Sequence, residues 1–253
     1  MPTDYDGIAA RYQTAKHHAW RTYVEAYTFL GMLGDLSGQA VVDLACGEGH
    51  YTRMLPSLGA ARVVGVDLSG GMIALARAQE AEHPLGIEYV VQDCRTLQLS
   101  QTFDVVAAAY LLNYAATREE LDKFCASVAR CLKPGGRFVT INSNPDIDFA
   151  NGSSYLKYGL EARAPGDKRP GMPFTWTFHL DDGPVEVENY YLPAADHEAA
   201  LESAGFTAVR WHFPRVSPLG EAAYPPGHWR EFVEHPPVIG IECIKSCEVP
   251  KRT

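Results

Sequence analysis

The sequence predicts an α/β domain in which seven mostly parallel strands form one sheet between two layers of helices. Short apolar runs alternate with helical patterns, turns rich in glycine or proline follow several of these runs, and 253 residues suit one domain with a sizeable core. We expect strands at residues 40–45, 62–67, 87–92, 103–109, 136–142, 207–213 and 237–245. We expect helices at residues 48–58, 69–82, 117–132 and 194–204.

These elements divide the single domain, residues 1–253, into four parts. Apolar and aromatic residues recur at helical spacing over residues 6–34, an addition that no strand–helix–strand unit requires. The expected parts are an N-terminal helical segment at 1–36, a ligand-binding half at 37–145, an insertion at 146–193 and the rest of the sheet at 194–253.

The insertion contains a turn signal between two alternating runs. Polar and apolar residues alternate over 174–180 and again over 185–191, on either side of the sequence DDGP at 181–184. Period-2 alternation around such a turn predicts a β-hairpin.

The first strand and the turn after it point to a ligand. Residues 41–49 read VVDLACGEG, and residues 63–67 read VVGVD, a second strand that ends in a carboxylate. Gly47 and Gly49 lack Cβ, so the backbone can approach a ligand closely. An acid at the end of the second strand, Asp67, can accept two ribose hydroxyls. The unit therefore predicts a nucleoside site.

The turn departs from the dinucleotide-binding fingerprint in two ways. The fingerprint needs a glycine three residues after Gly49, where this chain has Thr52. Glu48 stands where a pyrophosphate would pass, and its carboxylate would repel the phosphate oxygens. A nicotinamide-dependent oxidoreductase is therefore the weaker alternative, and a ligand with a cationic or neutral link fits better.

The run at 41–49 resembles the first motif of the class I S-adenosylmethionine-dependent methyltransferases, with Ala45 in place of the first glycine. The resemblance covers about residues 38–145 and includes three later segments: IEYVVQDC at 87–94, FDVVAAAY at 103–110 and LKPGGRFVT at 132–140. It implies a Rossmann-like sheet whose last strand is antiparallel. It also implies an enzyme that uses S-adenosylmethionine and releases S-adenosylhomocysteine.

The same resemblance implies which residues hold the cofactor. Asp93 and Cys94 match the position that hydrogen-bonds the adenine amino group. The run YDGIAARY at 5–12 is similar to a segment that closes over the cofactor as a lid, although its pattern also fits a helix packed on the sheet edge. The expected cofactor set is Tyr5, Tyr12, Asp43, Ala45, Cys46, Gly47, Gly49, Asp67, Leu68, Met72, Asp93, Cys94 and Ala109.

The pocket for the methyl acceptor is expected at the ends of the fourth and fifth strands, beside the N-terminal segment and the insertion. Aromatic rings and amides gather in these segments, and they suit a planar heteroaromatic molecule because rings stack on it and amides read its edge. The expected substrate residues are Tyr110, Asn113, Tyr114, Asn144, Tyr155, Trp176, Phe178 and Tyr190. The expected catalytic residues are Tyr110, Asn142 and His179, with His212, Glu161, Asp146 and Asp148 as alternative bases.

Two further runs indicate a subgroup within this methyltransferase family. YLLNYA at 110–115 and NSNP at 142–145 are similar to the toxoflavin-type small-molecule N-methyltransferases. The acceptor atom stays open between ring nitrogen, ring carbon and a phenolic oxygen, and a non-catalytic regulator that binds the cofactor is a further alternative. Because alignment of two reactants can contribute about 7–11 kcal/mol, a dedicated base is not required.

The composition of the chain argues against several classes of binding partner. The net charge of −9 argues against a general affinity for nucleic-acid phosphates. The six cysteines lack the paired spacing of a zinc site and are interpreted as reduced thiols. No long uncharged apolar run or signal peptide is found. We therefore expect a cytoplasmic monomer or homodimer that acts on a small aromatic molecule, without metal, nucleic acid or membrane.

Overall fold

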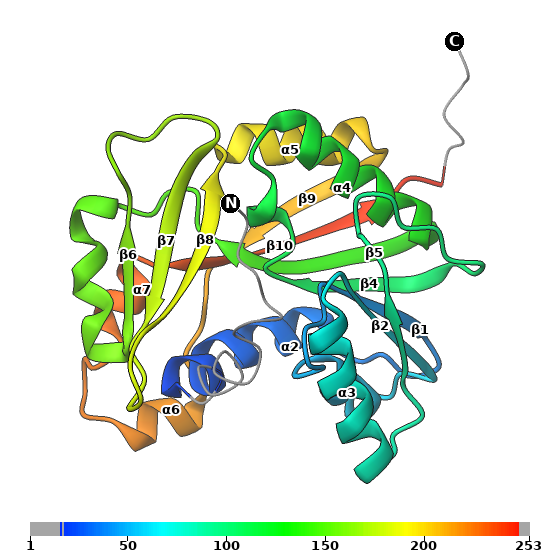
Figure 1. The fold of residues 1–253 in the computed structure, drawn as a ribbon, viewed down its shortest axis with the longest axis horizontal. Coiled ribbons are helices and arrows are strands. Elements are labelled where there is room, and N and C mark those ends of the chain that lie inside the picture. The colour runs from blue at the N-terminus through cyan, green and yellow to red at the C-terminus, as the bar shows by residue number, and fades with distance from the viewer. Residues whose placement is uncertain (1–15, 17, 248–253) are drawn as a thin grey trace.

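The computed structural model describes residue 16 and residues 18–247, and a seven-stranded sheet forms its centre (Figure 1). The strand order is β3-β2-β1-β4-β5-β10-β9. The strands are β1 (Ala40–Leu44), β2 (Arg62–Asp67), β3 (Glu88–Val91), β4 (Phe103–Ala109), β5 (Leu132–Ser143), β9 (Phe206–His212) and β10 (Val238–Lys245). Strands β1 to β5 pair in parallel, whereas β10 is antiparallel to both β5 and β9. The expected antiparallel last strand is confirmed.

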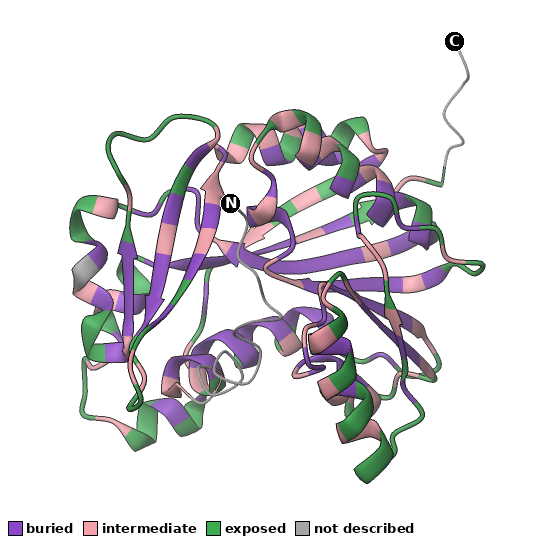
Figure 2. Ribbon diagram, viewed as in Figure 1, coloured by how far each residue is buried: buried purple, intermediate pink, exposed green. Residues whose placement is uncertain are grey.

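Both faces of the sheet are buried, so its strands consist of almost continuous apolar residues (Figure 2). Successive side chains of a strand point to opposite faces. Val41 and Val105 accordingly belong to one core cluster, and Val42 and Val106 belong to the other. Helix α3 (Gly70–Glu82) packs on one side of the sheet, and α4 (Arg118–Cys131) and α5 (Ala194–Ser203) pack on the other. The short helices α6 (Pro218–Ala223) and α7 (Arg230–Glu234) contact residues 21–26 and 149–158, respectively.

Helices α3 and α4 begin at residues whose side chains satisfy free backbone N–H groups. The Ser69 hydroxyl accepts a hydrogen bond from the Met72 N–H at 3.0 Å at the start of α3. At the start of α4, the Thr117 hydroxyl accepts a hydrogen bond from the Glu120 N–H at 3.3 Å. The predicted helix at 48–58 is wrong in type, because the chain forms a 3-10 helix, η2 (Thr52–Leu58), with Pro56 inside it. Proline lacks the N–H that an α-helix needs at that position.

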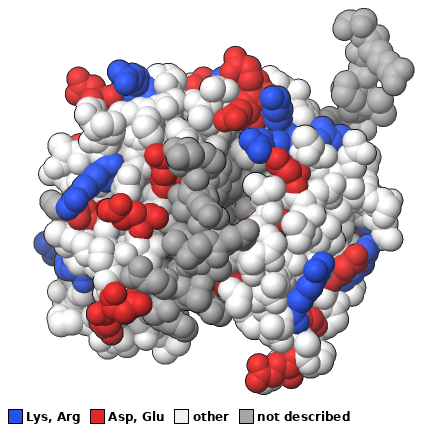
Figure 3. All heavy atoms as spheres, in the orientation of Figure 1, with Lys and Arg blue, Asp and Glu red and all other residues white. Residues whose placement is uncertain are grey.

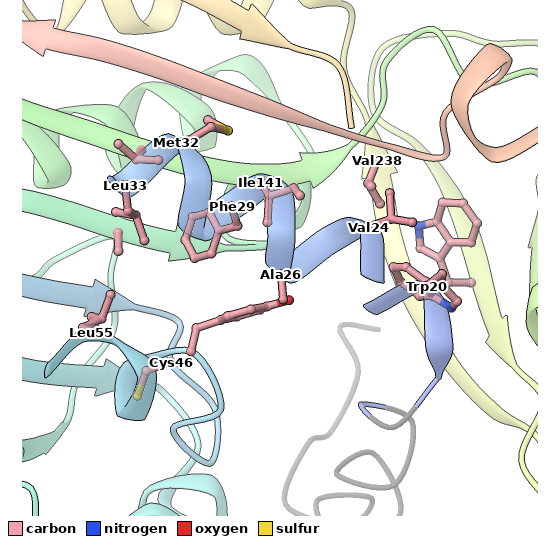
Figure 4. Close-up of a cluster of buried hydrophobic side chains, with 14 of the residues drawn as sticks. Trp20, Val24, Ala26, Phe29, Met32, Leu33, Cys46, Leu55, Ile141 and Val238 are labelled. Atoms are coloured by element: carbon pink, nitrogen blue, oxygen red, sulfur yellow. The ribbon is translucent and has the colours of Figure 1, made fainter. Parts of the chain in front are cut away.

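The N-terminal pattern forms a π-helix, η1 (Arg21–Ala26), that continues into α2 (Tyr27–Leu33). Figure 4 shows Trp20 and Val24 beside Val238 of β10, and Phe29 near Ile141 of β5. The helix therefore belongs to the core on one face of the sheet. The expected lid residues Tyr5 and Tyr12 lie outside the described residues.

The insertion forms a separate three-stranded antiparallel sheet beside the main one (Figure 1). Its order is β6 (Leu160–Arg163), β7 (Met172–Phe178) and β8 (Val185–Tyr191), and a 3-10 helix, η4 (Phe149–Tyr158), precedes it. The predicted hairpin corresponds to β7 and β8, which pair antiparallel. The prediction missed β6, whose four residues are too few to show a clear alternation.

Candidate functional site

The larger of two pockets lies at the carboxyl ends of the parallel strands. It holds about 1210 Å³ of empty space, the part open to solvent included. We call it the strand-end pocket. Ten of the expected cofactor residues line it: Asp43, Ala45, Cys46, Gly47, Asp67, Leu68, Met72, Asp93, Cys94 and Ala109. Further lining residues are Lys16, Arg21, Tyr51, Arg95, Tyr110, Leu111, Tyr114 and Phe124.

The turn after β1 presents its backbone to this pocket because two residues adopt left-handed conformations. Ala45 has a φ of 58° and Gly47 a φ of 56°. Alanine rarely adopts this region, so Ala45 stands in a strained conformation where glycine would be relaxed. The Gly47 N–H donates to Asp67 Oδ2 at 2.8 Å, which ties the turn to the end of β2.

Gly49 does not line the pocket, unlike Ala45, Cys46 and Gly47 of the same turn. A Cβ at this position would lie 2.5 Å from the hydroxyl of Tyr89 in β3, and the φ of Gly49 is 89°. The glycine makes room for Tyr89, so the geometry does not support the expected contact between Gly49 and the cofactor.

Asp67 ends β2 with both carboxylate oxygens oriented by the backbone. Oδ1 accepts the Ser69 N–H at 2.9 Å, and Oδ2 accepts the Gly47 N–H. Each oxygen keeps a lone pair for a ligand. Burial raises the pKa of Asp67, while the two backbone donors act in the opposite direction. A half-buried carboxylate with spare acceptor capacity can bind two hydroxyl groups.

Asp43 is buried beneath the turn, and its carboxylate accepts a hydrogen bond from the Thr52 hydroxyl at 2.6 Å. Burial raises the pKa of Asp43 to about 7. Asp43 is therefore poised between its neutral and charged forms near neutral pH.

Asp93 and Arg95 form an ion pair at the far side of the pocket. Arg95 Nη2 lies 2.7 Å from Asp93 Oδ2, and this arginine holds the pKa of Asp93 below its usual range. The sequence analysis did not identify Arg95 as a site residue. The neighbouring Cys94 is buried, which raises the pKa of its thiol to about 12.

The smaller pocket, which we call the inner chamber, adjoins the strand-end pocket. It holds about 320 Å³ of empty space, the part open to solvent included. It is lined by Trp20, Arg21, Tyr110, Tyr114, Leu160, Trp176, Phe178, Val187, Asn189 and Val238. Arg21, Tyr110 and Tyr114 line both pockets. Four of the expected substrate residues, Tyr110, Tyr114, Trp176 and Phe178, are therefore brought together.

A buried polar network lies at the junction of the two pockets. Arg21 Nη1 lies 2.9 Å from Glu25 Oε1 and 3.1 Å from Oε2, and both side chains are almost inaccessible to solvent. The hydroxyls of Tyr51 and Tyr110 also donate to the Glu25 carboxylate. Tyr110 is held in a left-handed conformation with a φ of 67°. The sequence analysis missed Arg21 and Glu25, although two opposite charges four residues apart in an aromatic helix were a signal.

Three expected polar residues hold neighbouring backbone groups and line neither pocket. Asn142 Oδ1 accepts the Leu112 N–H at 3.1 Å. The Asn144 side chain donates to the Pro236 carbonyl at 2.9 Å, and the Tyr155 hydroxyl donates to the His235 carbonyl at 2.7 Å. The geometry therefore does not support a catalytic Asn142, nor substrate contacts by Asn144 and Tyr155.

The remaining expected residues also lie outside the lining of both pockets. His179 is exposed, with Nε2 3.5 Å from Glu161 Oε2 on the insertion. The Tyr190 hydroxyl donates to Glu188 Oε1 at 2.9 Å. Asn113 is buried without a hydrogen-bond partner for its amide among the described residues. The alternative base His212 pairs with Glu242 between β9 and β10, at 3.3 Å.

The described residues contain no group of three His, Cys, Asp or Glu side chains placed to hold a metal ion. Within the same part of the chain, the helices are all too short or too polar to traverse a lipid bilayer.

Comparisons with known proteins agree with this geometry. A family model described as a methyltransferase domain matches residues 41–136. The chain is 31% identical over 173 residues to N-demethylindolmycin N-methyltransferase of Streptomyces griseus, covering 67% of this chain and 70% of that protein. It is 32% identical over 152 residues to demethylmenaquinone methyltransferase of Lactococcus lactis, covering 57% of this chain and 56% of that protein.

A solved structure has the same fold. The S-adenosylmethionine-dependent methyltransferase from Mesorhizobium loti superimposes with a TM-score of 0.63 at 22% sequence identity. The superposition covers 91% of this chain and 100% of that chain. At this identity the likeness bears on the fold, including the order of the strands that border the strand-end pocket.

Proposed function

Because this chain belongs to the S-adenosylmethionine-dependent methyltransferases, we propose that it transfers a methyl group to a small planar heteroaromatic molecule held in the inner chamber. The observation that carries the proposal is the junction of the two pockets. Arg21, Tyr110 and Tyr114 border both spaces, so a ligand in one would meet a ligand in the other.

The residues of the strand-end pocket fit S-adenosylmethionine. Asp67 offers lone pairs to the ribose hydroxyls, and the Asp93–Arg95 pair offers polar groups to the adenine end. Lys16 and Arg21, which also pair with Glu48 and Glu25, bring N–H donors to the pocket lining that suit the amino-acid carboxylate. When bound, the cofactor supplies an electrophilic methyl group on a positively charged sulfur.

The chain's own residues contribute alignment and exclusion of water. Trp176, Phe178 and Val187 of the small sheet form apolar walls of the inner chamber, and these side chains are buried. Tyr110 is fixed at the junction by its hydrogen bond to Glu25. Such fixed walls hold a planar acceptor in one orientation, and orientation of this kind can lower a barrier by about 7–11 kcal/mol.

Nitrogen is the acceptor atom that we propose. The relative from Streptomyces griseus is an N-methyltransferase, and the runs at 110–115 and 142–145 are similar to the toxoflavin-type N-methyltransferases.

Nucleic acid is disfavoured as a substrate by the net charge of −9. On the face drawn in Figure 3, the described basic side chains lie in small groups among acidic ones.

Calorimetry and mass spectrometry test this function. S-adenosylhomocysteine should bind the full chain, and NADH should not. Incubation with methyl-labelled S-adenosylmethionine should then label N-demethylindolmycin or another nitrogen heteroaromatic compound. Labelling of a phenol at oxygen would contradict the proposed acceptor atom. Absence of S-adenosylhomocysteine binding, or labelling of nucleic acid in place of small molecules, would overturn the proposal.

A further inference from the structure

One tryptophan that lines the inner chamber, Trp20, has an indole N–H with no hydrogen-bond partner among the described residues. Trp20 is 1% exposed, and its Nε1 is buried with no partner in the described part of the chain. The other three indole N–H groups are satisfied: Trp176 donates to Ser143 Oγ at 2.9 Å, Trp211 to Glu198 Oε1 at 2.8 Å, and Trp229 to the Gly220 carbonyl at 3.0 Å. Trp20 is therefore the exception among the four tryptophans of the chain.

An unsatisfied buried donor destabilises a folded protein, because the group has lost its hydrogen bonds to water. Where such a group belongs to a residue that lines a pocket, a ligand can complete its hydrogen bonding. Trp20 borders the inner chamber and does not line the strand-end pocket. Its free N–H is thus associated with the space that we assign to the methyl acceptor.

The position of the Trp20 ring is fixed on several sides. The guanidinium carbon of Arg21 lies 4.6 Å from its ring centroid, and the ring of Phe232 lies 5.6 Å away, centroid to centroid. Figure 4 shows Trp20 next to Val238, which also lines the chamber. An indole held in this way presents its N–H in one direction, as a selective donor must.

We propose that Trp20 donates its indole N–H to the methyl-accepting substrate and determines specificity for it. The recognised group is a carbonyl oxygen or an imine-type ring nitrogen on a planar aromatic molecule, since the donor needs an acceptor and the chamber walls are rings. This inference rests on the proposed function.

Indole N–H signals in a ¹H–¹⁵N spectrum of the full-length labelled protein test the proposal directly. The four signals are assigned by replacing each tryptophan in turn with phenylalanine. With S-adenosylhomocysteine present, quinoline is compared with naphthalene, which has the same shape and no ring nitrogen. We expect quinoline to move the Trp20 signal downfield and naphthalene to leave it near its starting position. The signals of Trp176, Trp211 and Trp229 serve as internal controls.

The W20F variant gives a second measurement, because phenylalanine keeps a ring and removes the N–H. We expect the quinoline Kd to rise about three- to tenfold while the naphthalene Kd stays unchanged. W176F is the matched control: Trp176 lines the same chamber, but its N–H is bonded to Ser143, so the preference for quinoline should persist.

The outcomes separate this inference from the proposed function. If S-adenosylhomocysteine binds but quinoline does not move the Trp20 signal, the proposed role of Trp20 is overturned. The methyltransferase assignment is not affected by that result. A W20F protein that still prefers quinoline over naphthalene would also overturn it. Loss of S-adenosylhomocysteine binding by the wild-type protein would instead overturn the proposed function. Because the spectra use wild-type protein, the test stands even if W20F fails to fold.

Discussion

The hydroxyl of Tyr110 donates a hydrogen bond to the buried carboxylate of Glu25, 85 residues earlier in the chain. Glu25 lies on the N-terminal π-helix, and Tyr110 follows the end of β4. Arg21 and Tyr51 complete the same network. This contact ties the N-terminal helix to the point where the strand-end pocket meets the inner chamber.

Replacing Glu25 with glutamine should disrupt this network. The carboxylate receives hydrogen bonds from three side chains, and the new amide would place an N–H₂ group against one of those donors. Breaking a buried ion pair from one side costs about 3–5 kcal/mol, so we expect a clear fall in the melting temperature together with reduced methyl transfer. Calorimetry and a turnover assay measure the two effects. E186Q, at an exposed position of β8, is the control, and equal behaviour of both variants would argue against the network.

Removing the Asp67 side chain should weaken cofactor binding more than it changes folding. D67A deletes both oxygens that we expect to accept the ribose hydroxyls. Loss of hydrogen bonds to a charged group costs about 1.5–3 kcal/mol, or roughly 10- to 150-fold in Kd for S-adenosylhomocysteine. Isothermal titration calorimetry gives this value. D122A, on the outer face of α4, should bind as the wild type does, and an unchanged Kd for D67A would remove Asp67 from the ribose site.

Stability should decrease with rising pH through the titration of Asp43. Burial raises its pKa to about 7 in the folded chain, from a reference near 3.9 when unfolded. Between these values the folded state binds more protons than the unfolded state, so the free energy of unfolding falls as pH rises from about 4 to about 7. The loss amounts to at most about 4 kcal/mol.

D43N isolates this contribution, because asparagine keeps an oxygen for the Thr52 hydroxyl and does not titrate. Denaturant unfolding of both proteins at several pH values gives the difference between them. We expect the wild type to lose stability relative to D43N across this range. Two parallel curves would mean that Asp43 has an ordinary pKa.

G49A should destabilise the fold more than G47A, because both glycines have a positive φ but only at Gly49 would the new Cβ collide with a neighbouring side chain. At Gly49 a Cβ would meet the Tyr89 hydroxyl at 2.5 Å, and the positive φ adds about 1–3 kcal/mol of strain. At Gly47 the nearest atom is Lys16 Nζ at 4.0 Å, and the residue lines the strand-end pocket. Thermal unfolding and S-adenosylhomocysteine titration separate the two effects. Y89F should restore part of the stability of G49A, and no rescue would show that strain alone dominates.

Local sequence was sufficient to predict ten residues that the structure brings together at the strand-end pocket. The turn at 45–49 and the acid at Asp67 belong to one strand–helix–strand unit, and parallel strands place their carboxyl ends at the same edge. The family followed from these runs, and the comparisons confirm it. Asp93 and Cys94 follow the neighbouring strand, so they reach the same pocket for the same reason.

The acceptor side was harder to predict because its residues come from distant segments. His179 and Asn142 have side chains suited to catalysis, but strand direction and local hydrogen bonds place them elsewhere. Trp176 and Phe178 were identified because both lie on the inward face of one strand, where alternation brings them to the same side.

Periodicity and turn residues act over a few neighbouring positions, so they were enough to predict the strands along the chain, the glycine turn after β1 and the family. Tertiary packing set the rest: Arg21 and Glu25 are buried together, Tyr110 donates to Glu25, and the indole N–H of Trp20 has no partner among the described residues. Those relationships depend on how helix η1 packs between the two sheets. Burial then changes the energy of each polar group according to the partners that the packing brings to it.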